Sequence, residues 1–406
     1  MRNIIYLIRN YEKHHAELLI LSLLNLFTSF SRGALVTYVP AFVNSFAGSI
    51  AVASLILAIP FFVNIFNDIA IGNLASRVNK KTLILSALAL LAVVGIAYFV
   101  SDSIIPVIIG LIVYGFAADL YFIPAYSAVA AISPRKEDAE YDAIFNSFGS
   151  LGWTLGPLAG GFILSFFIKD YIFLFFSILC VFTFLFVLFA MKSKPKQANH
   201  EKSSFIEYAK NLSELKFLNR ETKTSLFLAA MILFWDNLLW MMIPIFVVSN
   251  GMSPQYTGIL LTFACLPYML FRIPAGIFED KLGKKQFFIP SLAIVAASFV
   301  LFGLSNNIIM SLLLVFVLST GGAILSPAVG GLIIDNTIPS QRSVVISLRN
   351  IFVNFATIIS FVLGGLIAQF FGFSVMFISI GFVVIAAGII TEFSLFQAES
   401  KKKELK

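Results

Sequence analysis

Apolar residues fill long stretches of this 406-residue chain, and charged residues gather in the short stretches between them. Residues 82–101 and 171–191, for example, contain no charged side chain. A helix of about 20 apolar residues crosses the roughly 30 Å hydrocarbon layer of a bilayer. The pattern therefore predicts an all-α integral membrane protein with twelve spans. Their expected ranges are 17–42, 50–76, 82–101, 104–132, 142–168, 171–191, 224–249, 255–279, 285–304, 308–334, 343–370 and 373–396.

One long polar stretch, residues 192–223, separates six predicted spans from the other six. The sequence thus predicts an N-terminal six-helix bundle in residues 1–191 and a C-terminal bundle with a cytoplasmic tail in residues 224–406. Within the linker, apolar residues recur at helical spacing between charged ones. This spacing is typical of an amphipathic helix on the inner membrane surface, and equally of a solvated helical linker.

The two halves are related by an internal repeat. A constant offset of 204 residues aligns Arg32 with Asp236, Pro40 with Pro244, Gly72 with Gly276, Asn146 with Asn350 and Gly160 with Gly364. Two pseudo-symmetric bundles with a site near the membrane midplane are an architecture of secondary transporters. The repeat therefore predicts transport by alternating access, with a small molecule as the substrate.

Composition excludes a water-soluble protein, because 59% of the residues are hydrophobic and only 12% are charged. The net charge of +7 does not indicate nucleic-acid binding, since 24 of the 28 basic residues lie at the termini and in alternate loops. By the positive-inside rule, both termini and the central linker are cytoplasmic. We expect a multi-pass protein of the cell membrane, embedded as a monomer in the lipid bilayer.

The residue types needed for catalysis or metal binding are scarce. Cys180 and Cys265 lie inside apolar blocks, and His14, His15 and His200 lie outside the predicted spans. No catalytic constellation, metal site or cofactor motif follows from this set, so we expect neither an enzyme nor a cofactor. A receptor on the same scaffold would usually add a soluble signalling domain, and the longest loop is only the linker.

A few charged residues fall inside the predicted spans, where each costs at least about 2.5–3.5 kcal/mol on insertion scales. Arg32, Asp119 and Asp236 fall near the same depth, roughly twelve to fifteen residues from the inner edge of their spans. We interpret Arg32 as the group that holds an anion, and Asp236 or Asp119 as the carrier of the coupling proton. The alternative is a permanent Arg32–Asp119 pair that only sets the helix register.

Polar and aromatic residues near this depth are the candidate substrate ligands. Asn25, Ser29 and Arg32 share one face of the first span, and Asp236 shares a face of the seventh with Trp240. The complete candidate set is Arg32, Asn25, Ser29, Tyr38, Asn64, Tyr121, Trp240 and Asn237.

Asp68 and Arg272 are related by the repeat and have opposite charges. They are candidates for an ion pair that closes a cytoplasmic gate. The alternative is local pairing of each with loop charges near Arg77 and Glu279.

Two motifs resemble those of the major facilitator superfamily. The stretch Gly276 to Lys285, and more weakly Gly72 to Lys81, is similar to its G-x-x-x-D-R-x-G-R-K loop, with Asp280 at the acidic position. Glycines in the fifth span, including Gly156 followed by Pro157, resemble the signature of the twelve-span drug:proton antiporters in that superfamily. The resemblance implies gating roles for Asp280, Gly156 and Pro157.

The resemblance implies proton-coupled export of small amphiphilic or drug-like molecules by an antiporter. The alternative is a transporter of an anionic metabolite or a lipid-linked head group that uses Arg32, because Phe30 to Gly33 is similar to the first span of a glycolipid flippase. Ser29 and Asn64 stand where the carboxylates of that flippase would be expected.

Overall fold

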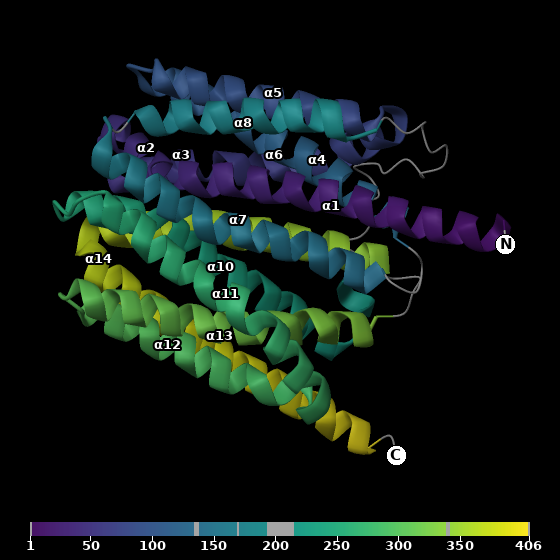
Figure 1. Ribbon diagram of the computed structural model, residues 1–406. Coiled ribbons are helices and arrows are strands. Elements are labelled where there is room, and N and C mark those ends of the chain that lie inside the picture. The colour runs from purple at the N-terminus through teal and green to yellow at the C-terminus, as the bar shows by residue number, and fades with distance from the viewer. Residues whose placement is uncertain (1, 134–137, 169, 193–214, 338–341, 405–406) are drawn as a thin grey trace. The chain divides into compact units, whose positions relative to one another are not determined.

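The computed structural model consists of helices joined by short connections (Figure 1). It describes residues 2–133, 138–168, 170–192, 215–337 and 342–404, and no strand occurs within these ranges. Most of the predicted linker lies outside the described residues, and so do Phe205, Tyr208 and Leu212 of its amphipathic pattern, whose last member is Leu215.

The helices follow one another in the expected order. Their bounds are α1 Arg2–Val36, α2 Val39–Ala47, α3 Ile50–Leu57, α4 Ile59–Arg77, α5 Lys80–Phe99, α6 Ile104–Ile132, α7 Asp138–Phe166, α8 Tyr171–Ala190, η1 Leu215–Phe217, α10 Arg220–Ser249, α11 Gln255–Leu282, η2 Lys284–Phe287, α12 Phe288–Leu304, α13 Ile308–Asp335 and α14 Arg342–Glu404.

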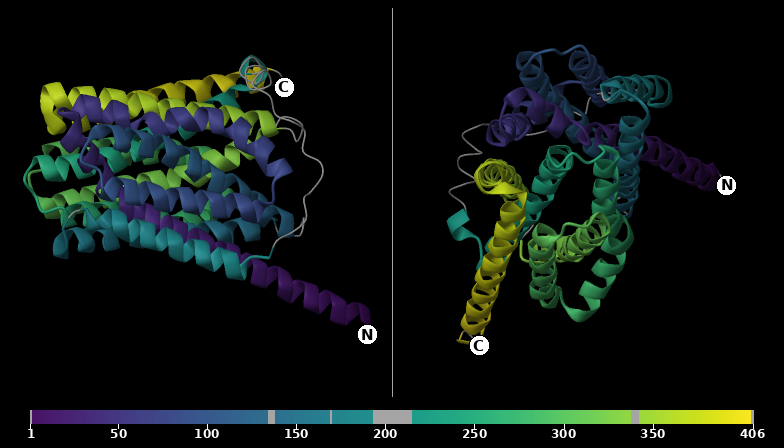
Figure 2. Two further views of the ribbon diagram at one scale, coloured as in Figure 1. Left: turned by 90° about the horizontal axis from the view of Figure 1, so that it is seen from above. Right: turned by 90° about the vertical axis from the view of Figure 1, so that its left-hand side faces the viewer.

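These helices confirm the predicted twelve-span, all-α fold. In the described part of the chain, ten stretches are long and apolar enough to cross a membrane. One of them, residues 344–395, holds two spans, because Gly372 interrupts α14 with a φ of 84° that favours glycine. Figure 2 shows the two yellow segments of α14 running in different directions. The 29-residue, glycine-rich α7 supplies the remaining span.

The first two spans are interrupted, whereas the apolar pattern predicts continuous helices over 17–42 and 50–76. The first span ends as α1 at Val36 and resumes as α2 at Val39, and the second is divided between α3 and α4 at Ala58. Each new helix carries a proline, Pro40 or Pro60, at its second position. Proline has no N–H to donate and fits the first turn of a helix but not its interior, so each break falls just before one.

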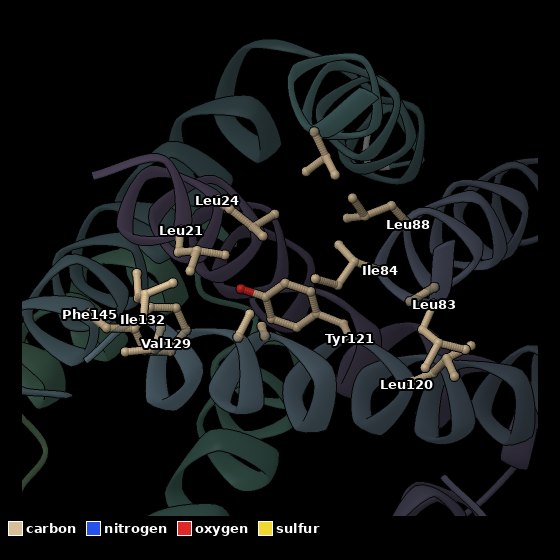
Figure 3. Close-up of a cluster of buried hydrophobic side chains, with 14 of the residues drawn as sticks. Leu21, Leu24, Leu83, Ile84, Leu88, Leu120, Tyr121, Val129, Ile132 and Phe145 are labelled. Atoms are coloured by element: carbon tan, nitrogen blue, oxygen red, sulfur yellow. The ribbon is translucent and has the colours of Figure 1, made fainter. Parts of the chain in front are cut away.

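The chain forms two compact units. Unit 1 comprises residues 1–38 and 66–203, and unit 2 comprises residues 39–65 and 204–406. In unit 1, α1 packs mainly on α7, and α5 packs on both α6 and α8. Its core includes Leu24, Ile84, Leu88 and Tyr121, each at most 1% exposed. Figure 3 shows the Tyr121 hydroxyl turned towards the side of α1 that carries Leu24.

In unit 2, α14 packs on both α10 and α12, and α13 packs on α11 and α12. The unit also contains the hairpin of residues 39–65, in which α3 packs on α14 and α2 packs on α10. The backbone N–H of Ile50 donates to Gln369 Oε1 at 2.8 Å, and the rings of Phe61 and Phe361 lie 5.4 Å apart. The hairpin therefore packs as part of unit 2, although the flanking parts of its two spans belong to unit 1.

The glycines of α7 allow α1 to approach closely. A Cβ on Gly152 would lie 2.5 Å from the carbonyl oxygen of Leu26, and one on Gly156 would lie 2.5 Å from that of Phe30. These are backbone atoms of α1, which cannot move without moving the helix. The glycines of the fifth span therefore form the surface of α7 on which α1 packs, as expected for small residues at a membrane helix interface.

Replacing Gly152 by alanine is expected to destabilise unit 1 by about 1–3 kcal/mol, the usual cost of overpacking. The measurement is thermal unfolding of the purified protein in detergent. Gly276→Ala is the matched control, because its Cβ would make only an ordinary contact, 3.7 Å from Pro327 Cβ. Equal melting temperatures for the two variants would contradict a tight α1–α7 contact.

Candidate functional site

Arg32 lies on α1, and its side chain contacts two other helices of unit 1, α6 and α7. Its Nε donates a hydrogen bond to Tyr114 Oη on α6 at 3.0 Å. Its Cζ lies 5.5 Å from the ring centroid of Tyr114 and 5.5 Å from that of Trp153 on α7. Among the described residues, no hydrogen bond or ion pair involves its two terminal nitrogens. The rings hold the guanidinium by cation–π contact, while the terminal N–H groups remain available to a ligand.

Asp119 on α6 has a different contact from the one that the permanent-pair alternative requires. Its Oδ2 accepts a hydrogen bond from Asn67 Nδ2 at 3.0 Å. No ion pair joins Asp119 to Arg32 within the residues that the structure describes. Asp119 is connected to α4 through Asn67 and also acts electrostatically on Arg32, so the permanent pair stays an alternative.

Three predicted ligands of unit 1 meet in one hydrogen-bond network. Asn25 Nδ2 donates to the carbonyl oxygen of Phe145 at 2.9 Å, and Asn25 Oδ1 accepts from Ser29 at 3.3 Å and Tyr121 at 3.2 Å. All three side chains are buried, with Tyr121 only 1% exposed. This buried hydrogen-bond network fixes the packing of α1 against α6 and α7. It also positions the turn of α1 that precedes Arg32.

Two further candidates belong to the first two spans. The half-buried ring of Tyr38 lies 5.7 Å from that of Phe173 on α8. Asn64 is half-buried in the part of α4 that belongs to unit 2. A role of Asn64 in substrate binding stays a prediction.

Asp236 lies on α10 in unit 2. Its Oδ2 accepts a hydrogen bond from Tyr268 Oη on α11 at 2.6 Å. The neighbouring Asn237 donates from Nδ2 to Thr357 Oγ1 on α14 at 2.8 Å. Asp236, Asn237 and Trp240 are all half-buried. Two successive polar residues of α10 are thus tied to two different helices.

The second copy of the loop motif forms an ion-pair cluster around the end of α11. Lys284 Nζ lies 2.6 Å from Asp335 Oδ2 and 3.4 Å from Asp280 Oδ1. The next residue, Lys285, lies 2.9 Å from Oε1 of Glu221, whose side chain is only 7% exposed. The motif lysines thus tie this end of unit 2 together, with Asp280 as an exposed member of the cluster.

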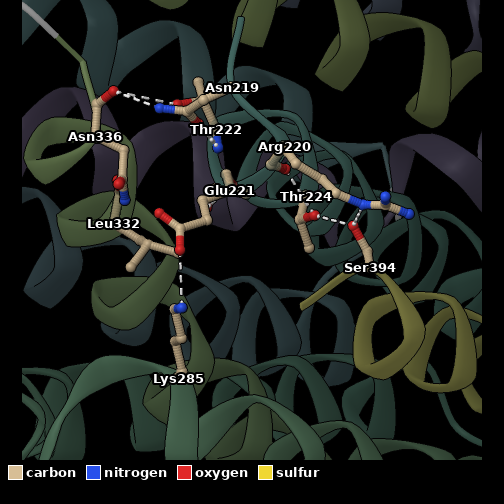
Figure 4. Close-up of polar contacts among 10 residues, drawn as sticks. Asn219, Arg220, Glu221, Thr222, Thr224, Lys285, Leu332, Asn336 and Ser394 are labelled. Atoms are coloured by element: carbon tan, nitrogen blue, oxygen red, sulfur yellow. Dashed lines mark hydrogen bonds and ion pairs between the residues drawn. The ribbon is translucent and has the colours of Figure 1, made fainter. Parts of the chain in front are cut away.

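Further polar contacts continue the cluster along α10. Asn219 caps the helix by accepting from the N–H of Thr222 at 2.7 Å, and its Nδ2 donates to the carbonyl oxygen of Asn336 at 3.0 Å. Arg220 and Thr224 both bond to Ser394 on α14. Figure 4 shows these contacts converging on the first turns of α10.

The remaining gating candidates differ in how they are placed. Arg272 on α11 is exposed, one turn after Tyr268. Asp68 lies in α4, but its side chain is outside the described residues, so the proposed Asp68–Arg272 gate stays a prediction. Gly156 and Pro157 face α1, where a Cβ on Gly33 would lie 3.0 Å from Pro157 Cδ.

The partners of the two main charges were not among the predicted site residues. Tyr114 and Trp153 contact Arg32, and Tyr268 contacts Asp236. Tyr114 shares a face of α6 with Tyr121, seven residues later, and this spacing was a usable signal. For Trp153 and Tyr268 the sequence offered little, because aromatic residues make up 15% of the chain.

Comparison with known proteins supplies the family. The model of the Major Facilitator Superfamily matches residues 21–235 and 225–406. The MFS-type transporter MJ1560 of Methanocaldococcus jannaschii is 22% identical over 345 residues, which is 85% of this chain and 86% of the relative. The MFS-type transporter YhjO of Bacillus subtilis is 29% identical over 113 residues, only 28% of each chain.

Solved structures show the same fold. A mutant of the nucleoside transporter NupG aligns with a TM-score of 0.77 at 13% identity, covering 93% of this chain and 99% of that one. A POT family transporter in complex with 5-aminolevulinic acid aligns with a TM-score of 0.76 at 12% identity, covering 94% and 96%. The family model matches both halves of the chain. The chain therefore belongs to the major facilitator superfamily, whose members are membrane transporters and not enzymes.

Proposed function

We propose that this protein is a secondary active transporter that works by alternating access and moves a small amphiphilic organic anion, driven by protons. A single observation carries the proposal: Arg32 is held by its Nε and its flat face, while its terminal nitrogens have no partner among the described residues. An arginine in a membrane span is expensive and marks a functional site by default.

The geometry of Arg32 favours a carboxylate or a phosphate as the bound group. The guanidinium presents its donors in a planar fork that matches two oxygens of such an anion. Because Nε is bonded to Tyr114, the fork is already oriented before a ligand arrives. A preorganised donor binds more tightly, since less side-chain freedom is lost on binding.

The surroundings of the guanidinium favour an amphiphilic substrate with an aromatic or apolar body. Tyr114 and Trp153 flank Arg32, and both side chains are half-buried. An indole and a phenol ring next to a cation offer apolar surface beside the charge. The proposal therefore joins the two functions considered from the sequence, an amphiphile and an anion, in one substrate.

Export of drug-like molecules receives less support than anion transport. Export was implied by the glycines of the fifth span, and these glycines pack against α1. Such packing is independent of the direction of transport. We keep export by antiport as part of the proposal only as one of two possible directions of a proton-coupled cycle.

Two carboxylates are our candidates for the coupling proton. Asp236 accepts from Tyr268 and Asp119 accepts from Asn67, so both are hydrogen-bonded within the membrane-spanning region. A carboxylate that gains and loses a proton changes the charge of its helix by one unit. We propose Asp236 as the main proton carrier, in a monomer of the cell membrane with both termini in the cytoplasm.

Ligand-dependent thermal stability tests the anion site. We expect 4-phenylbutyrate to raise the melting temperature of the purified protein, and the cation 4-phenylbutylamine to leave it unchanged. A ligand at 100 times its Kd stabilises the folded state by about 2.7 kcal/mol. In Arg32→Ala the effect of the carboxylate should disappear, whereas Arg349→Ala, which removes an exposed arginine of α14, should retain it. Stabilisation by the amine, or by the carboxylate in Arg32→Ala, would contradict the proposal.

A further inference from the structure

The hydroxyl of Tyr268 is a point at which three helices of unit 2 meet. Tyr268 belongs to α11, and its Oη donates to Asp236 Oδ2 on α10 at 2.6 Å. On α13, Gly322 faces the same hydroxyl: a Cβ at this position would lie 2.3 Å from Tyr268 Oη and 3.1 Å from Cζ. The tyrosine therefore reaches the carboxylate only because α13 has no side chain there.

The position of Gly322 is specific within its helix. The preceding Gly321 faces α12 instead, where a Cβ would lie 2.8 Å from Val295 Cγ2 and 2.9 Å from the carbonyl oxygen of Ser291. Further along, Gly330 has nothing within 4 Å of its Cβ position. These three glycines thus have separate surroundings, and only Gly322 contacts the tyrosine that binds Asp236.

The strength of the bond depends on the charge of Asp236. An O–H···O⁻ bond to an ionised acceptor is typically about 2.5–2.7 Å long and roughly twice as strong as a bond between neutral groups. A proton on Asp236 converts the first kind into the second. Among the described residues, the other titratable groups that act on this pair are Cys265 and Arg272, both on α11.

We propose that Tyr268, seated against Gly322, links the charge of Asp236 to the packing of α10, α11 and α13. Proton uptake weakens the α10–α11 bond, and proton release restores it. Tyr268 and Gly322 are then positioning residues, through which the protonation of Asp236 changes the packing of the three helices. This inference rests on the proposed proton-carrying role of Asp236 and assigns the contact through which that role reaches the fold.

A double-mutant cycle in thermal stability tests the contact without any substrate. Gly322→Ala should lower the melting temperature, because the new methyl group overlaps the Tyr268 hydroxyl. Combining it with Tyr268→Phe should recover most of that loss, since the atom 2.3 Å away is removed and only the 3.1 Å contact to Cζ remains. Gly330→Ala, in open space, is the matched control and should not lower the melting temperature.

Transport in proteoliposomes tests the link itself. Tyr268→Phe and Gly322→Ala should each lower the maximal rate of proton-driven transport by about tenfold or more, the effect expected for losing a hydrogen bond to a charged group. The KM should change little, and the double variant should be no slower than Tyr268→Phe alone. A merely structural role would lower the amount of folded protein rather than the rate per folded molecule.

The outcomes separate the two proposals. Additive losses of stability from Gly322→Ala and Tyr268→Phe, or an unchanged rate in Tyr268→Phe, would overturn the link. If the stability cycle and the rate losses occur as expected but Asp236→Asn still couples transport to protons, the contact stands and the proton-carrying role of Asp236 fails.

Discussion

Replacing Asp236 by asparagine is expected to reduce proton-driven accumulation of substrate to the background of protein-free vesicles. Asparagine keeps the size of the side chain and offers Oδ1 to the Tyr268 hydroxyl, so the 2.6 Å contact between α10 and α11 can persist. It cannot take up a proton at neutral pH. Exchange of labelled for unlabelled substrate at equal concentrations should therefore continue while uphill transport stops.

The measurement is substrate uptake into proteoliposomes with and without an imposed pH gradient. Asp102→Asn, which changes an exposed aspartate between α5 and α6, is the matched control and should retain full uptake. Asp119→Asn is measured in parallel, because Asp119 is the second candidate. Uphill uptake that persists in both Asp236→Asn and Asp119→Asn would contradict proton coupling through these carboxylates.

Joining the hairpin of residues 39–65 to α14 is expected to stop transport completely and reversibly. The N–H of Ile50 lies 2.8 Å from Gln369 Oε1, so cysteines at positions 50 and 369 can be bridged by a short, cleavable thiol cross-linker. In alternating access one set of helices must separate from another in each cycle. Since the hairpin packs in unit 2 while its flanking segments belong to unit 1, we expect this contact to open during transport.

The experiment starts from Cys180→Ala/Cys265→Ala, which removes the two native cysteines. Transport by Ile50→Cys/Gln369→Cys should fall to background after cross-linking and return after reduction. Each single-cysteine variant, treated identically, should keep its activity. Undiminished transport by the fully cross-linked protein would show that the contact is permanent and that the moving surfaces lie elsewhere.

The repeat predicted equivalent positions for Arg32 and Asp236, and the structure gives them unlike surroundings. Arg32 is flanked by two aromatic rings, whereas Asp236 is held by one short hydrogen bond from Tyr268. Residues related by the 204-residue repeat lie on equivalent helices of the two halves. Their contacts come from neighbouring helices, and the sequences of those neighbours differ between the halves. This is why the sequence indicated the charges themselves but not the aromatic partners.

The glycines of the fifth span illustrate a different limit. Their spacing predicted a face without side chains, and Gly152 and Gly156 do contact backbone atoms of α1. A gating role for Gly156 and Pro157 was implied only by the resemblance, and it remains a prediction. The contact between α1 and α7 is seen in one conformation, and it is compatible both with helices that separate during transport and with helices that stay together.

The apolar pattern by itself determined the class of protein and the number of spans, because the bilayer constrains every span in the same way through its thickness and its lack of water. The loop motif was sufficient to predict the family. Tertiary structure alone decided that the hairpin of residues 39–65 packs on α10 and α14, and which side chains meet Arg32 and Asp236. These contacts join residues far apart in the chain and depend on the rotation of each helix, which a pattern that is apolar on all sides does not specify.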